Sequence, residues 1–257
     1  MEINILCVGN SFAVDVSTYV HQIAKSAGHD INIYVLYIPG CPIDLHYKNF
    51  LSGEKQYEFY ENGGRNPIMY CSIHEGLNYK KWDYIIFQQR SGDSGDAKTF
   101  FPELPLLMEG IRKNSDAKFL LHMTWSYAKS FSHERYGSNP MDQEAMDRDI
   151  FKAYDEVSKL VNVPYIIPTG KAIRKAREKY GDVLDRDGYH LSEMGRALAG
   201  ILWNYYLLGL DIDISNYLPT GFTYDDVTKG VNKDTYLSLI DIAKEVIIDN
   251  KGHNLYE

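Results

Sequence analysis

Short apolar runs alternate with amphipathic stretches along most of this chain. The first run, residues 3–8, is rich in β-branched residues and ends in Gly9-Asn10-Ser11, and apolar positions then recur at helical spacing over residues 15–27. This pattern predicts a buried strand, a tight turn and a helix that packs back onto the sheet. Because open α/β sheets bind ligands beyond the carboxyl ends of their strands, the turn that contains Ser11 is a candidate site of chemistry.

The same alternation continues towards the C-terminus and predicts the fold class. Strands that alternate with helices form a mostly parallel sheet covered on both faces. We therefore expect an α/β fold, a three-layer α/β/α sandwich with a mostly parallel five-stranded sheet. Further strands are expected over residues 31–38, 82–87, 118–123 and 163–167, and further helices over 74–81, 103–113, 142–160, 171–180, 192–208 and 235–250.

Two segments interrupt this alternation. Residues 56–72 hold two aromatic-rich runs around an Asn-Gly pair, which is a strong hairpin signal, and we expect this hairpin insertion on the loop face of the sheet, beside Ser11. Residues 126–140 are polar and aromatic without periodicity, and are expected to form a loop over the same face. No stretch rich in Pro, Gly or Ser is long enough for a linker, so residues 1–257 are predicted to form a single domain.

Composition and charge narrow the classes of function. The chain has a formal net charge of −8, whereas a nucleic-acid binder presents a basic face, so no nucleic-acid partner is expected. Its 3 cysteines show no CxxC spacing, which argues against a disulfide framework or zinc site and favours a reducing compartment. Neither a signal peptide nor an apolar run of membrane length is visible, so we expect a cytoplasmic protein without a membrane partner, although a trimmed secreted form would look the same.

A second candidate segment, Asp187-Gly188-Tyr189-His190, precedes the predicted helix 192–208. A serine hydrolase needs an imidazole that hydrogen-bonds the nucleophile through one nitrogen, and a carboxylate that orients the other nitrogen. An aspartate and a histidine three residues apart in one turn can project the same way and supply both groups. Taken alone, however, this segment is more commonly a helix-capping turn, and the first turn is also explained if Ser11 or Asp15 caps its helix.

Taken together, these segments resemble the sequence blocks of the SGNH hydrolase superfamily, the GDSL-like esterases and lipases. Residues 9–12 stand where that family has its Gly-Asp-Ser block, Gly40 matches its glycine after the second strand, and residues 187–190 match its Asp-x-x-His block. The resemblance implies a flavodoxin-like SGNH hydrolase fold and a triad of Ser11, His190 and Asp187. It also implies an oxyanion hole that contains the N–H groups of Ser11 and Gly40, and a reaction that needs no metal or organic cofactor.

The third block of the family is changed in this sequence. No Gly-x-Asn-Asp follows the predicted strand 82–87, and Gln88-Gln89-Arg90 stands there instead. In the family that asparagine donates a hydrogen bond to the oxyanion, and related carbohydrate acetylesterases have glutamine in this block. Glutamine carries the same carboxamide on a longer stem, so Gln89, or else Gln88, is expected to be the third oxyanion donor. A polar strand end without such a role remains the alternative.

The leading hypothesis is a serine esterase that removes acetyl or other short acyl groups from a carbohydrate or small metabolite. Asn10, Arg90, Trp125 and Tyr189 are expected to shape its pocket, although core packing would explain Trp125 equally well and a surface ion pair is the commoner role for Arg90. Because the third block has changed, the alternative is a catalytically silent carbohydrate-binding or scaffold module on the same fold. A nucleotide-binding Rossmann protein is disfavoured, since the glycine-rich fingerprint after the first strand is missing.

Overall fold

A mostly parallel sheet lies at the centre of the molecule. The computed structural model describes residues 2–138, 140–217 and 231–256, and within these ranges seven strands form the central sheet. Its strands are β1 (Glu2–Gly9), β2 (Asp30–Tyr37), β3 (Tyr57–Glu61), β4 (Met69–Cys71), β5 (Tyr84–Phe87), β6 (Lys118–His122) and β9 (Ile166–Ile167). They lie in the order β4-β3-β2-β1-β5-β6-β9, and the run from β2 to β9 is parallel.

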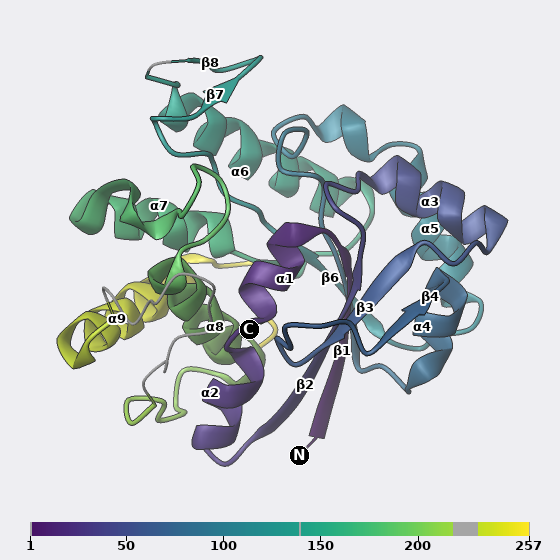
Figure 1. Cartoon of the computed structure of the whole chain (residues 1–257), viewed down its shortest axis with the longest axis horizontal. Helices are drawn as coiled ribbons and strands as arrows, with labels where there is room; N and C mark the ends of the chain where they lie inside the picture. Colours follow the sequence, from purple (N-terminus) through teal and green to yellow (C-terminus); the bar gives the residue numbers. More distant parts are fainter. Residues whose placement is uncertain (1, 139, 218–230, 257) are drawn as a thin grey trace.

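Helices cover both faces of this sheet, as Figure 1 shows. One face carries α1 (Ser11–Ser17), α2 (Val20–Ser26), α8 (Glu193–Leu208) and α9 (Lys233–Asp249), and the other carries α3 (Ile43–Ser52), α4 (Ile73–Tyr79) and α5 (Glu103–Arg112). The remaining elements are α6 (Gln143–Leu160), α7 (Thr169–Tyr180), the 3₁₀ turns η1 (Ala97–Phe100) and η2 (Gly181–Leu184), and a small ribbon of β7 (Ser132–His133) and β8 (Gly137–Ser138). The α/β/α sandwich expected from the sequence is therefore confirmed.

The sheet nevertheless has more strands than the five expected. β3 pairs antiparallel with β2, and β4 pairs antiparallel with β3, so the segment predicted as a hairpin insertion extends the sheet instead of lying on its loop face. Pairing with β2 buries the alternate side chains Tyr57 and Phe59 completely. The turn after β3 reaches the C-terminal end of α1, where a Cβ on Gly63 would lie 2.5 Å from the carbonyl oxygen of Thr18, the residue that caps this helix.

Two helices also differ from the sequence-based expectation. The predicted helix 15–27 begins earlier, at Ser11, and is interrupted between α1 and α2, where the hydroxyls of Ser17 and Thr18 both donate to the Val14 carbonyl and compete with the helical ladder. The pattern did not predict α3, because two of its three buried residues, His46 and Asn49, are polar.

The central strands position the site. β1 is buried at nearly every position, as expected for a parallel strand with helices on both faces, and each buried aliphatic side chain contributes roughly 1.5–3 kcal/mol. Because β1, β2, β5 and β6 are parallel, their carboxyl ends lie at the same edge of the sheet. The loops that begin at this edge contain Ser11, Gly40, Gln88 and Trp125, all of which the sequence singled out.

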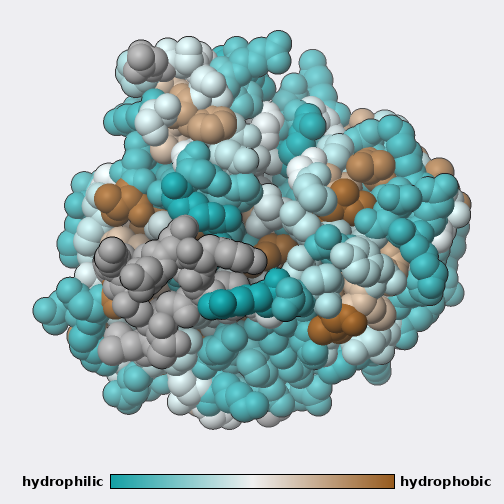
Figure 2. All heavy atoms as spheres, viewed as in Figure 1, coloured by the Kyte–Doolittle hydropathy of each residue, from teal (hydrophilic) through white to brown (hydrophobic). Residues whose placement is uncertain are grey.

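In the part of the chain that the structure describes, none of the helices is both long and apolar enough to cross a bilayer. On the face seen in Figure 2, outside the grey residues, most of the surface is hydrophilic and the hydrophobic residues form small separate groups.

Candidate active site

The turn after β1 leaves the Ser11 hydroxyl available for chemistry. Asn10 caps α1, because its Oδ1 accepts a hydrogen bond of 3.1 Å from the Phe12 N–H. A Cβ on Gly9 would lie 2.7 Å from the Ala13 Cβ, so only glycine lets the strand pass this close to the helix. The cap predicted for Ser11 or Asp15 is therefore supplied by Asn10.

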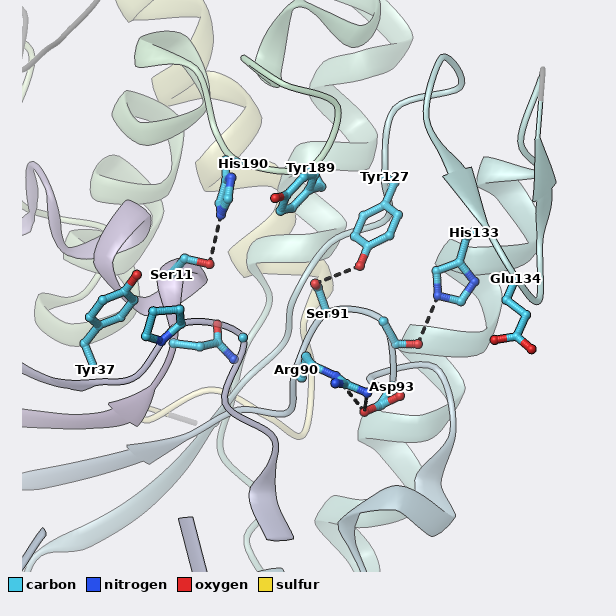
Figure 3. A pocket seen from close by; sticks show the side chains of 14 residues that line it. Ser11, Tyr37, Arg90, Ser91, Asp93, Tyr127, His133, Glu134, Tyr189 and His190 are labelled. Atoms are coloured by element: carbon cyan, nitrogen blue, oxygen red, sulfur yellow. Dashed lines mark hydrogen bonds and ion pairs between the residues drawn. The ribbon is translucent and has the colours of Figure 1, made fainter. Parts of the chain in front are cut away.

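The structure brings Ser11, His190 and Asp187 together. The His190 Nε2 lies 2.9 Å from the Ser11 Oγ, and Figure 3 shows the two side chains facing each other at one end of a cleft. The His190 Nδ1 lies 2.7 Å from the Asp187 Oδ2. Because an ionised carboxylate can only accept, Nδ1 carries the ring proton and Nε2 is left to accept from the serine hydroxyl. This is the tautomer that a general base requires.

Local geometry holds Asp187 in place. Its Oδ1 accepts hydrogen bonds from the N–H groups of His190, at 2.8 Å, and Tyr189, at 3.3 Å. Burial raises the pKa of Asp187, but the hydrogen bonds from the backbone and ring of His190 and from the Tyr189 N–H outweigh it and hold that pKa below its ordinary value. Gly188 has a φ of +96°, and a Cβ there would lie 2.7 Å from the Phe131 ring, so this turn requires glycine.

Asp15 links the first helix to the loop that carries His190. It is 1% exposed, and its Oδ1 accepts hydrogen bonds from Arg186 Nη1 at 2.9 Å, Arg196 Nε at 3.0 Å and Arg196 Nη2 at 2.9 Å. Its Oδ2 accepts a hydrogen bond of 2.9 Å from the N–H of Leu191. Since Leu191 follows His190 directly, this carboxylate fixes the distance between the imidazole and the helix that begins at the nucleophile.

Replacement of Asp15 by alanine is expected to destabilise the protein strongly. Two guanidinium groups would lose a buried carboxylate, and breaking a buried pair from one side typically costs about 3–5 kcal/mol. The free energy of unfolding, measured by urea denaturation, checks this. Asp241→Ala, on the exposed side of α9, is the matched control and should change stability by no more than about 0.5 kcal/mol. An Asp15→Ala effect as small as that of the control would contradict the role assigned to this carboxylate.

A polar and aromatic cleft lies beside the triad. Its volume is about 460 Å³, and its lining includes Tyr37, Arg90, Asp93, Tyr127, His133 and Tyr189. Arg90 and Asp93 form an ion pair of 2.6 Å, and the hydroxyls of Ser91 and Tyr127 lie 2.9 Å apart (Figure 3). In the described part of the chain, no group of three or more His, Cys, Asp or Glu side chains is arranged to hold a metal ion.

The residues predicted to shape the pocket lie in different places. Arg90 and Tyr189 line the cleft, as does Asn10, although the Asn10 side chain is turned inward. The prediction for Trp125 is wrong: it is completely buried, its ring stacks on Phe12 with centroids 3.9 Å apart, and its indole N–H donates to the Tyr189 carbonyl at 2.8 Å. It therefore does not line the cleft, but holds the backbone of Tyr189, which does.

Several lining residues were not predicted from the sequence. His133 and Glu134 come from the loop that was expected over the sheet face, and Figure 3 shows them on the side of the cleft away from Ser11. The aromatic and polar content of that loop was the only signal, and it could not identify which side chains turn inward.

Two backbone N–H groups are candidates for an oxyanion hole. Gly40 lines the same cleft as Ser11 and has a φ of +59°, a conformation that glycine adopts readily. Among the described residues, neither the Ser11 N–H nor the Gly40 N–H donates a hydrogen bond. Both donors are therefore available to a bound ligand.

The predicted third donor is not present in the structure. The Gln89 Nε2 donates to the Thr99 carbonyl at 2.7 Å, and its Oε1 accepts from the Ile43 N–H at 3.0 Å. The Gln88 Nε2 donates to the Asn10 Oδ1 at 2.8 Å. Both glutamines are buried, so neither carboxamide faces the cleft, and the assignment of either one as a direct oxyanion donor is wrong.

Comparison with known proteins places the chain near one family. The profile of the family described as "Domain of unknown function (DUF4886)" matches residues 4–238. A DUF4886 family protein from Bacteroides uniformis ATCC 8492 superposes with a TM-score of 0.86 at 29% sequence identity, over 99% of this chain and 98% of that chain. No curated protein matches the chain.

More distant structures share the fold. A candidate SGNH hydrolase from Slackia heliotrinireducens has a TM-score of 0.53 at 17% identity, over 78% of this chain and 96% of that chain. A candidate GDSL-like lipase from Parabacteroides merdae ATCC 43184 has a TM-score of 0.53 at 13% identity, over 79% of this chain and 94% of that chain. Likeness at these identities concerns the fold alone, and it confirms the SGNH-type fold expected from the sequence.

Proposed function

This chain belongs to the DUF4886 family, and we propose that it acts as a serine esterase on small acyl esters. One observation carries the proposal: the Ser11 hydroxyl, the His190 imidazole and the Asp187 carboxylate form a continuous relay, with contacts of 2.9 and 2.7 Å. Such a relay converts a weakly nucleophilic hydroxyl into an attacking group, and it ends here in an open cleft.

The reaction follows from the roles of these groups. The Ser11 Oγ attacks the ester carbonyl carbon while the His190 Nε2 takes the hydroxyl proton, and Asp187 stabilises the resulting imidazolium. The N–H groups of Ser11 and Gly40 donate to the oxyanion that develops on the carbonyl oxygen. When the intermediate collapses, the leaving alcohol takes the proton from His190. Water then attacks the acyl-serine, His190 accepts the water proton and returns it to Ser11, and the carboxylic acid leaves.

The polar and aromatic lining of the cleft suits a short acyl group and a hydrophilic alcohol. We therefore propose acetyl esters of carbohydrates as the substrate class. Tyrosine side chains offer flat amphipathic surfaces for a sugar ring, and the Arg90–Asp93 pair offers both donors and acceptors to hydroxyl groups. A lipase would instead require an extended apolar binding surface for a long acyl chain.

The acyl preference gives a direct test. With p-nitrophenyl esters, we expect kcat/KM for the acetate to exceed that for the octanoate by about tenfold or more, because the cleft cannot bury a long chain in apolar surroundings. Release of acetate from peracetylated monosaccharides, measured by an enzyme-coupled assay, extends the test to the alcohol. A preference for the octanoate would contradict a short-acyl esterase.

One observation favours the second candidate, a catalytically silent carbohydrate-binding module. The cleft lacks the third oxyanion donor expected from the sequence, and loss of one such donor typically lowers kcat by about 10²–10³-fold. The two candidates make opposite predictions for wild type and Ser11→Ala on p-nitrophenyl acetate. Equal rates near the uncatalysed background, together with sugar binding in calorimetry, would favour the silent module.

A further inference from the structure

A buried line of hydrogen bonds runs beneath the turn that holds Ser11. The His122 Nδ1, at the end of β6, lies 2.7 Å from the Gln88 Oε1, which follows β5. The Gln88 Nε2 donates to the Asn10 Oδ1 at 2.8 Å, and the Asn10 Nδ2 donates to the Cys41 carbonyl at 3.1 Å. All four residues are at most 2% exposed. The line therefore connects three strand ends with the loop after β2.

The direction of every hydrogen bond in this line is set at Asn10, whose two backbone partners fix the orientation of its amide. The Phe12 N–H can only donate and the Cys41 carbonyl can only accept, so together they set which atom of the Asn10 amide faces each of them. Gln88 must then present its nitrogen to Asn10 and its oxygen to His122. His122 must in turn donate through Nδ1–H.

His122 supplies this single donor and little other polar interaction. Its Nε2 has no hydrogen-bond partner among the described residues, and its ring packs at 5.2 Å, centroid to centroid, from Trp203. Burial lowers the pKa of His122 to about 3, so the ring stays neutral with one N–H. Leaving a buried nitrogen unsatisfied is costly, and an apolar side chain would serve packing better. The donor to Gln88 is therefore the feature that favours a histidine over an apolar side chain here.

The far end of the line meets the two peptides that matter for the reaction. Asn10 directly precedes Ser11, and Cys41 directly follows Gly40, so the Asn10–Cys41 hydrogen bond ties together the segments that carry both candidate oxyanion donors. We propose that Gln88 and His122 are positioning residues that hold the oxyanion hole of this esterase. This inference rests on the proposed function. It gives Gln88, in the changed third block, an indirect role: it holds Asn10, which precedes the oxyanion donor Ser11.

Physical chemistry makes such a line effective. Hydrogen bonds that all point the same way polarise one another, so the terminal amide is held more firmly than by a single contact. Oxyanion donors act by being placed in advance where negative charge develops. A displacement of about 1 Å at such a site can lower the rate by on the order of a hundredfold.

The test compares two substitutions at His122. Asparagine can place an N–H near the position of Nδ1 and so keep the donor to Gln88, whereas leucine has a similar volume and no donor. We expect His122→Leu to lower kcat for p-nitrophenyl acetate by about tenfold or more with KM within about twofold, and His122→Asn to retain more of kcat. Gln88→Met, which removes both hydrogen bonds of Gln88, replaces His122→Leu if thermal melting shows that the leucine variant is unfolded.

A second readout does not depend on turnover. Amide hydrogen exchange at Phe12, followed by NMR, reports the turn directly because this N–H is bonded to the Asn10 Oδ1. We expect faster exchange in His122→Leu than in wild type and His122→Asn. Unchanged exchange in the leucine variant, or equal kcat loss in both variants, would overturn the inference. If wild type hydrolysed no ester, the proposed function would fail, and the exchange result would still decide whether the line orders the turn.

Discussion

Replacement of Ser11 by alanine is expected to lower kcat for p-nitrophenyl acetate by on the order of 10⁴-fold or more. The methyl group of alanine cannot form the acyl-enzyme. In wild type the His190 Nε2 lies 2.9 Å from the Ser11 Oγ, and in the variant it has no hydroxyl proton to remove. The measurement is a steady-state assay of wild type and variant at equal concentration, with the variant purified on unused resin to exclude carry-over of wild type.

The matched control is Ser26→Ala, an exposed serine at the end of α2. It should keep the wild-type kcat, and both variants should melt close to wild type, because the Ser11 side chain contributes a hydrogen bond to His190 and little packing. A Ser11→Ala variant with the wild-type rate would show that the activity measured has another nucleophile.

The second large effect is expected for Asp187→Asn, which should lower kcat by on the order of 10⁴-fold. The carboxylate accepts from the His190 Nδ1 at 2.7 Å, whereas an asparagine amide can turn its NH₂ towards that nitrogen. The ring proton would then move to Nε2, which could no longer accept the proton of the serine hydroxyl. The geometry would be nearly unchanged while the base is lost.

Asp241→Asn, on the exposed side of α9, is the control for this loss of charge and should leave kcat unchanged. Thermal melting of Asp187→Asn separates a lost base from a displaced loop, since Gly188 and the contacts of Asp15 with the same loop remain. If Asp187→Asn kept more than about a tenth of the wild-type kcat, the carboxylate would not set the histidine tautomer, and the triad would reduce to a dyad.

The parts of the site that were predictable from the sequence are those set by local pattern. The first strand and the turn at Ser11 follow from an apolar run that ends in glycine, and residues 187–190 bring their carboxylate and imidazole together within one turn. Both rest on neighbours in the chain, so spacing alone carries the information. The α/β/α order follows similarly from periods of strand and helix.

The parts that were not predictable depend on partners far along the chain. Nothing near Gln88 or Gln89 reveals that their carboxamides are taken up by Asn10 and by Thr99, so the family pattern suggested a direct role that the packing does not allow. The hairpin strands likewise show their own pairing in the sequence, but not that β2 offers them an edge.

The most direct test of the account is the site at which a fluorophosphonate probe reacts. Such probes phosphonylate a serine only when a neighbouring base has activated it, so labelling reports the relay itself and needs no knowledge of the natural substrate. We expect mass spectrometry to find one adduct, on the peptide that contains Ser11, and little or none in heat-denatured protein and in Asp187→Asn. Absence of an adduct on Ser11 in the folded wild-type protein would contradict an activated Ser11.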